Sequence, residues 1–255
     1  MLNALIVIYN KYCCNSISFN YIKKYKSRLN IIIFDNSESD YGNRKYCKEN
    51  KIKYYTLNKN IGLSRAYNYV LEKIRINNND YLLILDDDTI LNDEYIDEVL
   101  RKVHESKFDL LLPVVKSNER IISPSKIIFG CRVKQIKTLD EINDNNITGI
   151  NSGMVIRTSV YNLIKYNDKM FLDYVDHEFM RKVRAKKLKI NVLESVIYQN
   201  FFMDEKSNIK TAMKRFNIYK KDFKKYCDIC GNNLFYRISI LKLKVNNLIK
   251  YKRFF

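Results

Sequence analysis

The chain has 255 residues, 46% of them hydrophobic, so it can form one large domain or two small ones around a sizeable core. It carries 46 Lys and Arg against 28 Asp and Glu, a formal net charge of +18, which excludes an acidic disordered chain and favours anionic partners. No apolar run reaches the ~18–20 residues that a membrane-spanning helix needs. The apolar stretch at residues 2–8 has no basic segment before it and predicts a buried strand rather than a signal peptide.

The first half of the sequence alternates short apolar runs with amphipathic stretches. The apolar runs predict buried strands at residues 2–8, 29–34, 52–56 and 81–85. The periodicity between them predicts one helix that ends near residue 26 and another that begins at Gly62. Asn92, followed by two acidic residues, is typical of the start of a third helix. This alternation predicts an α/β fold with a mostly parallel sheet flanked by helices.

The middle of the sequence is predicted to continue this fold. Residues 108–160 favour further strands and loops, with one strand at 152–156. A helix is expected from Asp176, and a strand is expected at 190–197.

The sequence changes in character after about residue 204. Two amphipathic helices are predicted there, and Lys and Arg crowd their polar positions. No linker rich in Pro, Gly or Ser precedes them. We expect two units, residues 1–205 and a basic helical tail at residues 206–255.

Cysteine and histidine usage limits the possible chemistry. The six cysteines are expected to be free thiols, and the CxxC pair of Cys227 and Cys230 has no histidine nearby to complete a zinc site. Only two histidines are present and no nucleophile-elbow pattern occurs, which disfavours a Ser-His-Asp triad. Catalysis, if present, is therefore expected from carboxylates.

Polar residues follow the predicted strands at points that would meet at one edge of a parallel sheet. Ligands of open α/β sheets bind at that edge, beyond the carboxyl ends of the strands. The residues found there are Tyr9, Asn10, Asp35, Asn36, Asn58–Gly62 and Asp86–Asp88. One such residue alone is often only a turn former, so a structural and a functional role for Asp35 are both open.

The adjacent carboxylates of Asp86, Asp87 and Asp88 favour a cation site. Neighbouring carboxylates repel one another, and the hard cations Mg²⁺ and Mn²⁺ take oxygen ligands, usually together with substrate phosphates. A metal at this position could stabilise a departing diphosphate. The alternative is a solvated acidic start of the next helix, continuing into Asp93 and Glu94.

Six segments resemble, in order, the motifs of family 2 glycosyltransferases with the GT-A fold. They are Val7–Asn10, Phe34–Ser37, Asn58–Asn68, Leu85–Thr89 with the DXD motif, Asn151–Met154 and Phe171–Phe179. Each is weak evidence alone, whereas six in family order with ordinary spacing are specific for the family. The last segment resembles the rhamnosyltransferase-like members. The resemblance covers roughly residues 3–200 and implies a GT-A, Rossmann-like catalytic domain over residues 1–205.

The resemblance implies an inverting glycosyltransferase. Such an enzyme would move a sugar from a nucleotide-diphosphate donor, of rhamnosyl or galactosyl type, to a hydroxyl of a glycan or lipid-linked acceptor in cell-surface polysaccharide synthesis. The chemistry needs a base for the acceptor hydroxyl and neutralisation of the leaving diphosphate. Mg²⁺ or Mn²⁺ is the expected cofactor.

The resemblance also implies roles for individual residues. Asp176 is expected to be the catalytic base, with Asp173 and Glu178 as alternatives, and Asp86 and Asp88 are expected to hold the metal. The expected nucleotide-sugar-binding residues are Ile8, Tyr9, Asn10, Asp35, Asn36, Asn60, Gly62, Arg65, Asp86 and Asp87. The expected acceptor-side residues are Asn151, Ser152, Gly153, Asp173 and Glu178.

Two departures from the family pattern affect these roles. Many members carry a histidine after the last core strand that can ligate the metal, whereas Val196–Asn200 contains none. The metal is then expected to be held mainly by Asp88 and the diphosphate, or weakly. Many members have Glu before the catalytic carboxylate, where this chain has Val175.

The basic tail allows two interpretations. It could lie on an anionic membrane surface and hold a lipid-diphosphate acceptor, which predicts a cytoplasmic protein at the inner face of the plasma membrane. It could instead pack on the catalytic domain. Two other function classes remain as alternatives, a basic nucleic-acid-binding protein and an inactive family-like scaffold. Nucleic acid is disfavoured as a partner because acidic residues surround the expected site and no recognised motif is present.

Overall fold

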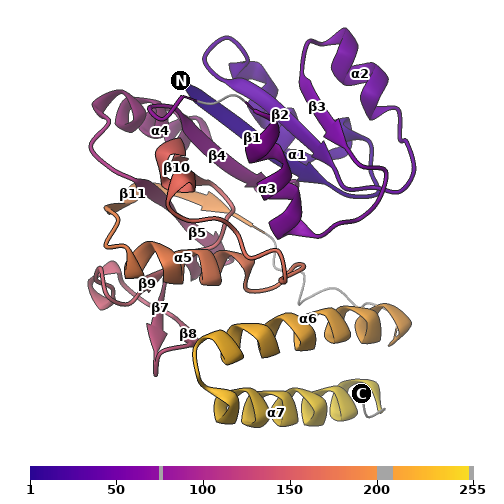
Figure 1. Cartoon of the computed structure of the whole chain (residues 1–255), viewed down its shortest axis with the longest axis vertical. Helices are drawn as coiled ribbons and strands as arrows, with labels where there is room; N and C mark the ends of the chain where they lie inside the picture. Colours follow the sequence, from indigo (N-terminus) through magenta and orange to yellow (C-terminus); the bar gives the residue numbers. More distant parts are fainter. Residues whose placement is uncertain (75–76, 200–208, 253–255) are drawn as a thin grey trace.

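The computed structural model describes residues 1–74, 77–199 and 209–252 (Figure 1). Within them, the central sheet has eight strands in the order β11-β5-β10-β4-β1-β2-β3, with β6 paired to β5. The strands are β1 (Leu2–Ile8), β2 (Asn30–Asp35), β3 (Lys53–Thr56), β4 (Tyr81–Asp86), β5 (Leu110–Ser117), β6 (Arg120–Ser123), β10 (Met154–Arg157) and β11 (Ile190–Tyr198).

The sheet is mostly parallel, as the sequence predicts. Strand β1 pairs in parallel with β2 and β4, β2 with β3, and β5 with β11. Strand β10 is antiparallel to both β4 and β5. Register aligns Ile8 with Asp35, and Asp35 with Thr56, while Val7 is level with Asp86. The ends of β1 to β4 therefore meet at one edge, where the sequence places its polar groups.

Alternate residues of the strands point to opposite faces and build two apolar clusters. Leu5 and Val7 of β1 face one cluster, and Ala4 and Ile6 face the other. The first cluster is covered by α3 (Leu63–Lys73), α5 (Val175–Ala185) and α6 (Ile209–Ile229). The second is covered by α1 (Ile17–Ile22), α2 (Asn43–Glu49) and α4 (Asp93–Glu105). Both faces are buried, which explains why β1 is apolar at every position except Asn3.

One predicted helix start is confirmed, one predicted helix is corrected, and one helix has no counterpart among the predicted elements. The Asn92 side chain accepts a hydrogen bond from the Tyr95 amide and caps α4 as predicted. The single helix expected to end near residue 26 is instead a 3-10 turn, the short α1, and a second 3-10 turn at Lys23–Tyr25. Helix α2 was not predicted.

A small antiparallel sheet lies beside the central one. It consists of β7 (Ser125–Ile128), β8 (Arg132–Gln135) and β9 (Ile147–Thr148), in the order β8-β7-β9. Further 3-10 turns occupy Cys13–Asn15, Leu139–Glu141 and Thr158–Asn162. For residues 125–148 the sequence predicts only unspecified strands and loops, whereas the strand predicted at 152–156 is confirmed as β10.

The predicted basic tail contains two long helices, α6 and α7 (Asn233–Tyr251), which lie side by side (Figure 1). Helix α6 packs on the core, because Phe223, Tyr226 and Cys227 belong to the apolar cluster of α3 and α5. The expected boundary between residues 205 and 206 lies outside the described residues. None of the helices in the described ranges is both long and apolar enough to cross a membrane. All six cysteines are free.

Candidate active site

The ends of β1 and β2 are joined by backbone and hydroxyl contacts. The Asn36 amide donates to the Ile8 carbonyl at 2.9 Å, and the Asn10 amide donates to Ser37 Oγ at 2.7 Å. Tyr9 lies between them, with 42% of its side chain exposed at the sheet edge. These contacts bring the predicted nucleotide-side residues Ile8, Asn10 and Asn36 together.

Asp35 is buried at the end of β2 and accepts three hydrogen bonds from the protein. Its donors are Asn43 Nδ2 at 2.7 Å, the Tyr54 hydroxyl at 2.9 Å and the Ser37 amide at 3.0 Å. Burial and the Asp35 charge raise the pKa of Tyr54, so this phenol remains a donor. Asp35 thus fixes the turn that presents Asn36, and its expected contact with a nucleobase stays a prediction.

Asn36 and Asn60 connect this turn to the start of α3. Asn36 Nδ2 donates to Asn60 Oδ1 at 2.9 Å, and Asn36 Oδ1 accepts from the Ile61 amide at 2.8 Å. Asn60 Oδ1 also accepts from the Gly62 amide at 3.0 Å. Gly62 has φ +81° and ψ 168°, a region essentially restricted to glycine. The expected Asn58–Gly62 segment is therefore held in one shape by amide side chains.

Asp86 lies where three separate elements meet. The Ser152 hydroxyl donates to its Oδ2, and Gln199 Nε2 donates to the same oxygen at 3.2 Å. Gln199 Nε2 also donates to Asp88 Oδ1 at 3.2 Å. The end of β4, the turn before β10 and the end of β11 are thus joined through two carboxylates and one amide.

The electrostatic environment of these carboxylates favours a cation. Partial burial raises the pKa of Asp86 to about 6, against the hydrogen bond from Ser152. The negative charges of Asp88 and Asp176 add to that rise. Burial also raises the pKa of Asp88, and the charge of Asp87 adds to it. A divalent cation would relieve both the repulsion and the lost hydration.

The donor atoms near Asp86 and Asp88 fit a divalent metal. Gln199 Oε1 is shielded from solvent and accepts no hydrogen bond from the residues that the structure describes. Turning the amide would bring this oxygen to face the carboxylates, an orientation that is unfavourable without a cation and favourable with one. Asp87 is engaged elsewhere, in an ion pair with Lys11 at 2.6 Å. In the described ranges, no three His, Cys, Asp or Glu side chains form a metal cluster, so Gln199 would be the third protein ligand.

The predicted acceptor-side turn is buried against β4 and α4. The Gly153 amide donates to the Ile84 carbonyl at 2.8 Å, and the Gly153 carbonyl accepts from the Tyr95 hydroxyl at 2.6 Å. Asn151 Oδ1 accepts from the Tyr166 hydroxyl at 3.2 Å. These bonds fix the turn so that Ser152 reaches Asp86.

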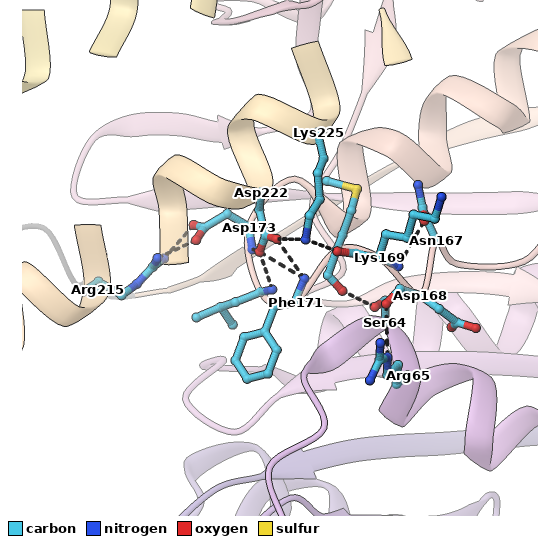
Figure 2. A network of polar contacts seen from close by, with 12 residues as sticks. Ser64, Arg65, Asn167, Asp168, Lys169, Phe171, Asp173, Arg215, Asp222 and Lys225 are labelled. Carbon is cyan, nitrogen blue, oxygen red and sulfur yellow. Dashed lines mark hydrogen bonds and ion pairs between the residues drawn. The ribbon is translucent and has the colours of Figure 1, made fainter. Parts of the chain in front are cut away.

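The three candidate bases have different surroundings. Asp173 is ion-paired with Arg215 of α6, and burial raises its pKa although that guanidinium opposes the rise (Figure 2). Glu178 is buried and lies 3.2 Å from Arg181 and 3.1 Å from Lys182.

Asp176 lies in the first turn of α5. Among the described residues, the ion-pair contact found for its carboxylate is with His177 and not with a Lys or Arg. Its Oδ1 accepts the His177 amide at 2.7 Å and lies 4.0 Å from His177 Nε2. His177 Nδ1 is itself 2.8 Å from Thr148 Oγ1, which holds the ring in place. Among the described residues, Asp176 is therefore the candidate base whose carboxylate is not paired with a Lys or Arg side chain.

Sequence reasoning missed several residues that the fold brings to this site. Gln199 is not among the predicted site residues, although its place directly after the last core strand is a signal in the sequence. The buried Tyr67 hydroxyl has no hydrogen-bond partner within the part of the chain that the structure describes, and burial and the charges of Asp86 and Asp176 raise its pKa. Arg65, expected near base or phosphate, is exposed and donates to the Asp168 carbonyl at 3.1 Å (Figure 2).

More than half of the chain matches the sequence model of one protein family. The sequence model of glycosyl transferase family 2 matches residues 4–164. No curated protein matches the chain.

Solved structures share the fold at low sequence identity. S. aureus TarS 1–349 is 19% identical over 78% of this chain and 60% of its own, with a TM-score of 0.55. The same protein in complex with UDP-GlcNAc aligns at 16% identity over 90% of this chain and 65% of its own, with a TM-score of 0.58. GalNAc-T7 with UDP, GalNAc and Mn²⁺ is 13% identical over 80% of this chain and 44% of its own, with a TM-score of 0.60. The chain thus spans less than two thirds of each of these proteins.

Proposed function

The chain belongs to glycosyl transferase family 2, and on this premise we propose that it transfers a sugar from a nucleoside-diphosphate donor to a hydroxyl of a glycan or lipid-linked acceptor. The observation that carries the proposal is the junction at Asp86. There the acceptor-side Ser152 and the strand-end Gln199 meet on one carboxylate. A donor bound beside this carboxylate would lie between Asn58–Asn68, the segment expected to bind the nucleotide, and Asp176.

The donor is proposed to bind along the ends of β1 to β4. The rigid network of Asn36, Asn60 and Gly62 supplies a preformed surface for the nucleoside. TarS in complex with UDP-GlcNAc and GalNAc-T7 with UDP support a uridine diphosphate sugar as the first donor to test. A thymidine diphosphate rhamnose donor rests on the Asp173–Glu178 segment alone, and galactose or galactofuranose donors are the next to test.

The metal is proposed to be held by Asp86, Asp88 and Gln199. Mg²⁺ or Mn²⁺ bound there would supply positive charge against the diphosphate. The protein's own contribution is to hold the two carboxylates with Ser152 and Gln199.

Asp176 is proposed to act as the catalytic base. Its carboxylate takes the proton of the acceptor hydroxyl while the acceptor oxygen forms a bond to the anomeric carbon. The bond between that carbon and the diphosphate oxygen breaks, and the nucleoside diphosphate leaves with the electron pair. Attack on the face opposite the leaving group inverts the anomeric configuration. Asp173 is a weaker candidate because its ion pair with Arg215 would have to open first.

Helix α7 is proposed to meet an anionic membrane surface that carries the acceptor. One side packs on the core through Ile240, whereas an apolar stripe on the other side is exposed. The stripe consists of Leu234, Ile238, Leu241, Val245 and Leu248, each 44–69% exposed. Exposed lysines accompany it, so apolar insertion and attraction to lipid charge would act together. This proposal places the protein at the inner face of the plasma membrane.

Replacement of Asp176 tests the proposed reaction. Asp176→Asn keeps the size of the side chain but cannot accept a proton, so donor binding should persist while turnover falls about 10²–10⁴-fold. Turnover is measured as nucleoside diphosphate released from a panel of uridine and thymidine diphosphate sugars with Mn²⁺. Asp173→Asn is the matched comparison. Full activity of Asp176→Asn with an inactive Asp173→Asn would move the base to Asp173.

A further inference from the structure

One carboxylate of the tail is buried against the loop that leads to Asp176. Asp222, on α6, is 1% exposed and accepts hydrogen bonds from three consecutive backbone amides (Figure 2). The donors are Phe171 at 3.0 Å to each oxygen, Leu172 at 2.8 Å and Asp173 at 3.1 Å. Successive amides converging on one anion form a charge-assisted nest. The loop conformation therefore depends on a charge that lies 49–51 residues away in sequence.

Two further side chains of α6 hold the same loop. Arg215 forms a two-pronged pair with the Asp173 carboxylate, and Lys225 donates to the Lys169 carbonyl (Figure 2). Lys225 Nζ is also 3.5 Å from Asp222 and partly balances the buried charge. Helix α6 thus holds the loop at both of the loop's ends, Lys169 and Asp173, and at the residues between them.

The opposite side of the loop contacts Asn58–Asn68, the segment that is expected to bind the nucleotide. The Phe171 carbonyl accepts the Leu63 amide at 2.7 Å, and the Ser64 hydroxyl donates to the Met170 carbonyl. Gly62 leaves no room beside Phe171, since a Cβ there would stand 2.6 Å from the Phe171 carbonyl oxygen. The loop is consequently fixed between α6 and the start of α3.

The loop continues directly into the first turn of α5. Tyr174, in the left-handed region at φ +59°, precedes the helix, and Asp176 lies in its first turn. A shift of the 171–173 backbone would therefore move the Asp176 carboxylate relative to Asn58–Asn68, the segment expected to bind the nucleotide.

We propose that Asp222 is a positioning residue for the transfer reaction. Its carboxylate fixes the backbone of residues 171–173 and thereby sets where Asp176 stands relative to the bound donor. This inference rests on the proposed function, in which Asp176 is the base. It makes α6 part of the catalytic unit rather than a separable extension.

Asp222→Asn tests this role with little change in size. The amide of Asn keeps one acceptor oxygen for the three loop amides, which all donate to Oδ2, but it removes the negative charge that strengthens these bonds. Its NH2 group would also replace Oδ1 as the partner of the Phe171 amide and of Lys225, and both contacts are lost. Asp228→Asn is the matched control, because Asp228 lies on the same helix and forms an exposed pair with Lys224 at 3.0 Å. Each variant is measured for hydrogen exchange of residues 171–173, for binding of uridine diphosphate with Mn²⁺, and for donor turnover.

The expected pattern separates positioning from general destabilisation. In Asp222→Asn the loop amides should exchange faster and kcat should fall about 10²-fold, as for a displacement of ~1 Å, while the nucleotide Kd stays within about threefold of wild type. The control should match wild type in all three. An unchanged kcat, or a nucleotide Kd that weakens in step with kcat, would overturn the proposal.

Two arrangements keep the test decisive. If Asp222→Asn does not fold, Asp222→Glu keeps the charge but moves it by one methylene group, and the same split between kcat and Kd is expected. Wild-type protein that binds no nucleotide would contradict the proposed function, whereas the exchange rates of the 171–173 amides would still decide whether Asp222 holds the loop.

Discussion

Replacing Gly62 with alanine should destabilise the protein through one identifiable contact. Gly62 adopts φ +81° and ψ 168°, a conformation that costs a non-glycine residue about 1–3 kcal/mol. The new methyl group would also stand 2.6 Å from the Phe171 carbonyl oxygen and 2.7 Å from its ring. Relieving such a clash in a packed site costs about 1–3 kcal/mol. The loss in free energy of unfolding should therefore be about 2–6 kcal/mol.

Gly42→Ala is the matched control for this substitution. Gly42 also has a positive φ, +84°, but a Cβ there would meet nothing within 4 Å. Its cost should be limited to the left-handed backbone, about 1–2 kcal/mol. The greater loss expected for Gly62→Ala reports the contact with Phe171 together with the costlier backbone region of Gly62.

Urea denaturation followed by far-UV circular dichroism measures both free energies, and the absence of tryptophan makes this probe preferable to fluorescence. The nucleotide Kd should weaken in Gly62→Ala and remain unchanged in Gly42→Ala. Equal losses of stability in the two variants would refute the reasoning, because they would show that the Phe171 contact adds nothing.

Three further predictions follow from the site and the tail. Asp88→Ala should abolish Mn²⁺-dependent nucleotide binding in titration calorimetry, whereas Glu94→Ala, at the exposed start of α4, should not. Equal effects of the two substitutions would favour the alternative in which these acidic residues are only the solvated start of a helix. Tyr95→Phe removes the donor to the buried Gly153 carbonyl and should cost about 1–3 kcal/mol in urea denaturation, with no loss indicating another partner for that carbonyl. Neutralising three exposed tail lysines should weaken binding to anionic liposomes at low salt, by up to about 100-fold at roughly 1 kcal/mol each, and unaltered binding would contradict the membrane proposal. The lysines to replace with Gln are Lys242, Lys250 and Lys252.

The central strands were predictable because their signal is local. Residues 2–8 are apolar except for Asn3, and the structure places β1 at Leu2–Ile8. The start of α4 was predictable for the same reason, since Asn92 caps the helix with its own side chain. Helix α2 was not predictable, because Asn43–Glu49 buries only Asn43 and Cys47 and shows no apolar stripe.

The acidic part of the site was predictable, whereas its partners were not. Asp86 and Asp88 stand out as adjacent carboxylates after an apolar strand, a pattern visible in the sequence. Gln199 reaches them across more than a hundred residues, and its one signal in the sequence is its place directly after the last core strand.

The role of α6 was beyond sequence reasoning for a similar reason. Its basic, amphipathic pattern fits a membrane surface and a protein surface equally well. Only the fold shows that Phe223 and Tyr226 enter the core and that Asp222 reaches the loop before α5.

Calorimetric titration of the protein with uridine diphosphate, in Mn²⁺ and in excess EDTA, tests whether a metal holds the nucleotide at the end of β4. We expect one saturable site in Mn²⁺ and a large loss of affinity in EDTA, because Asp86 and Asp88 repel a diphosphate that carries no cation. The same titration with thymidine diphosphate compares the two proposed nucleotides. No binding of either nucleotide in Mn²⁺, or equal binding in EDTA, would contradict a metal-assisted nucleotide-sugar site at the end of β4.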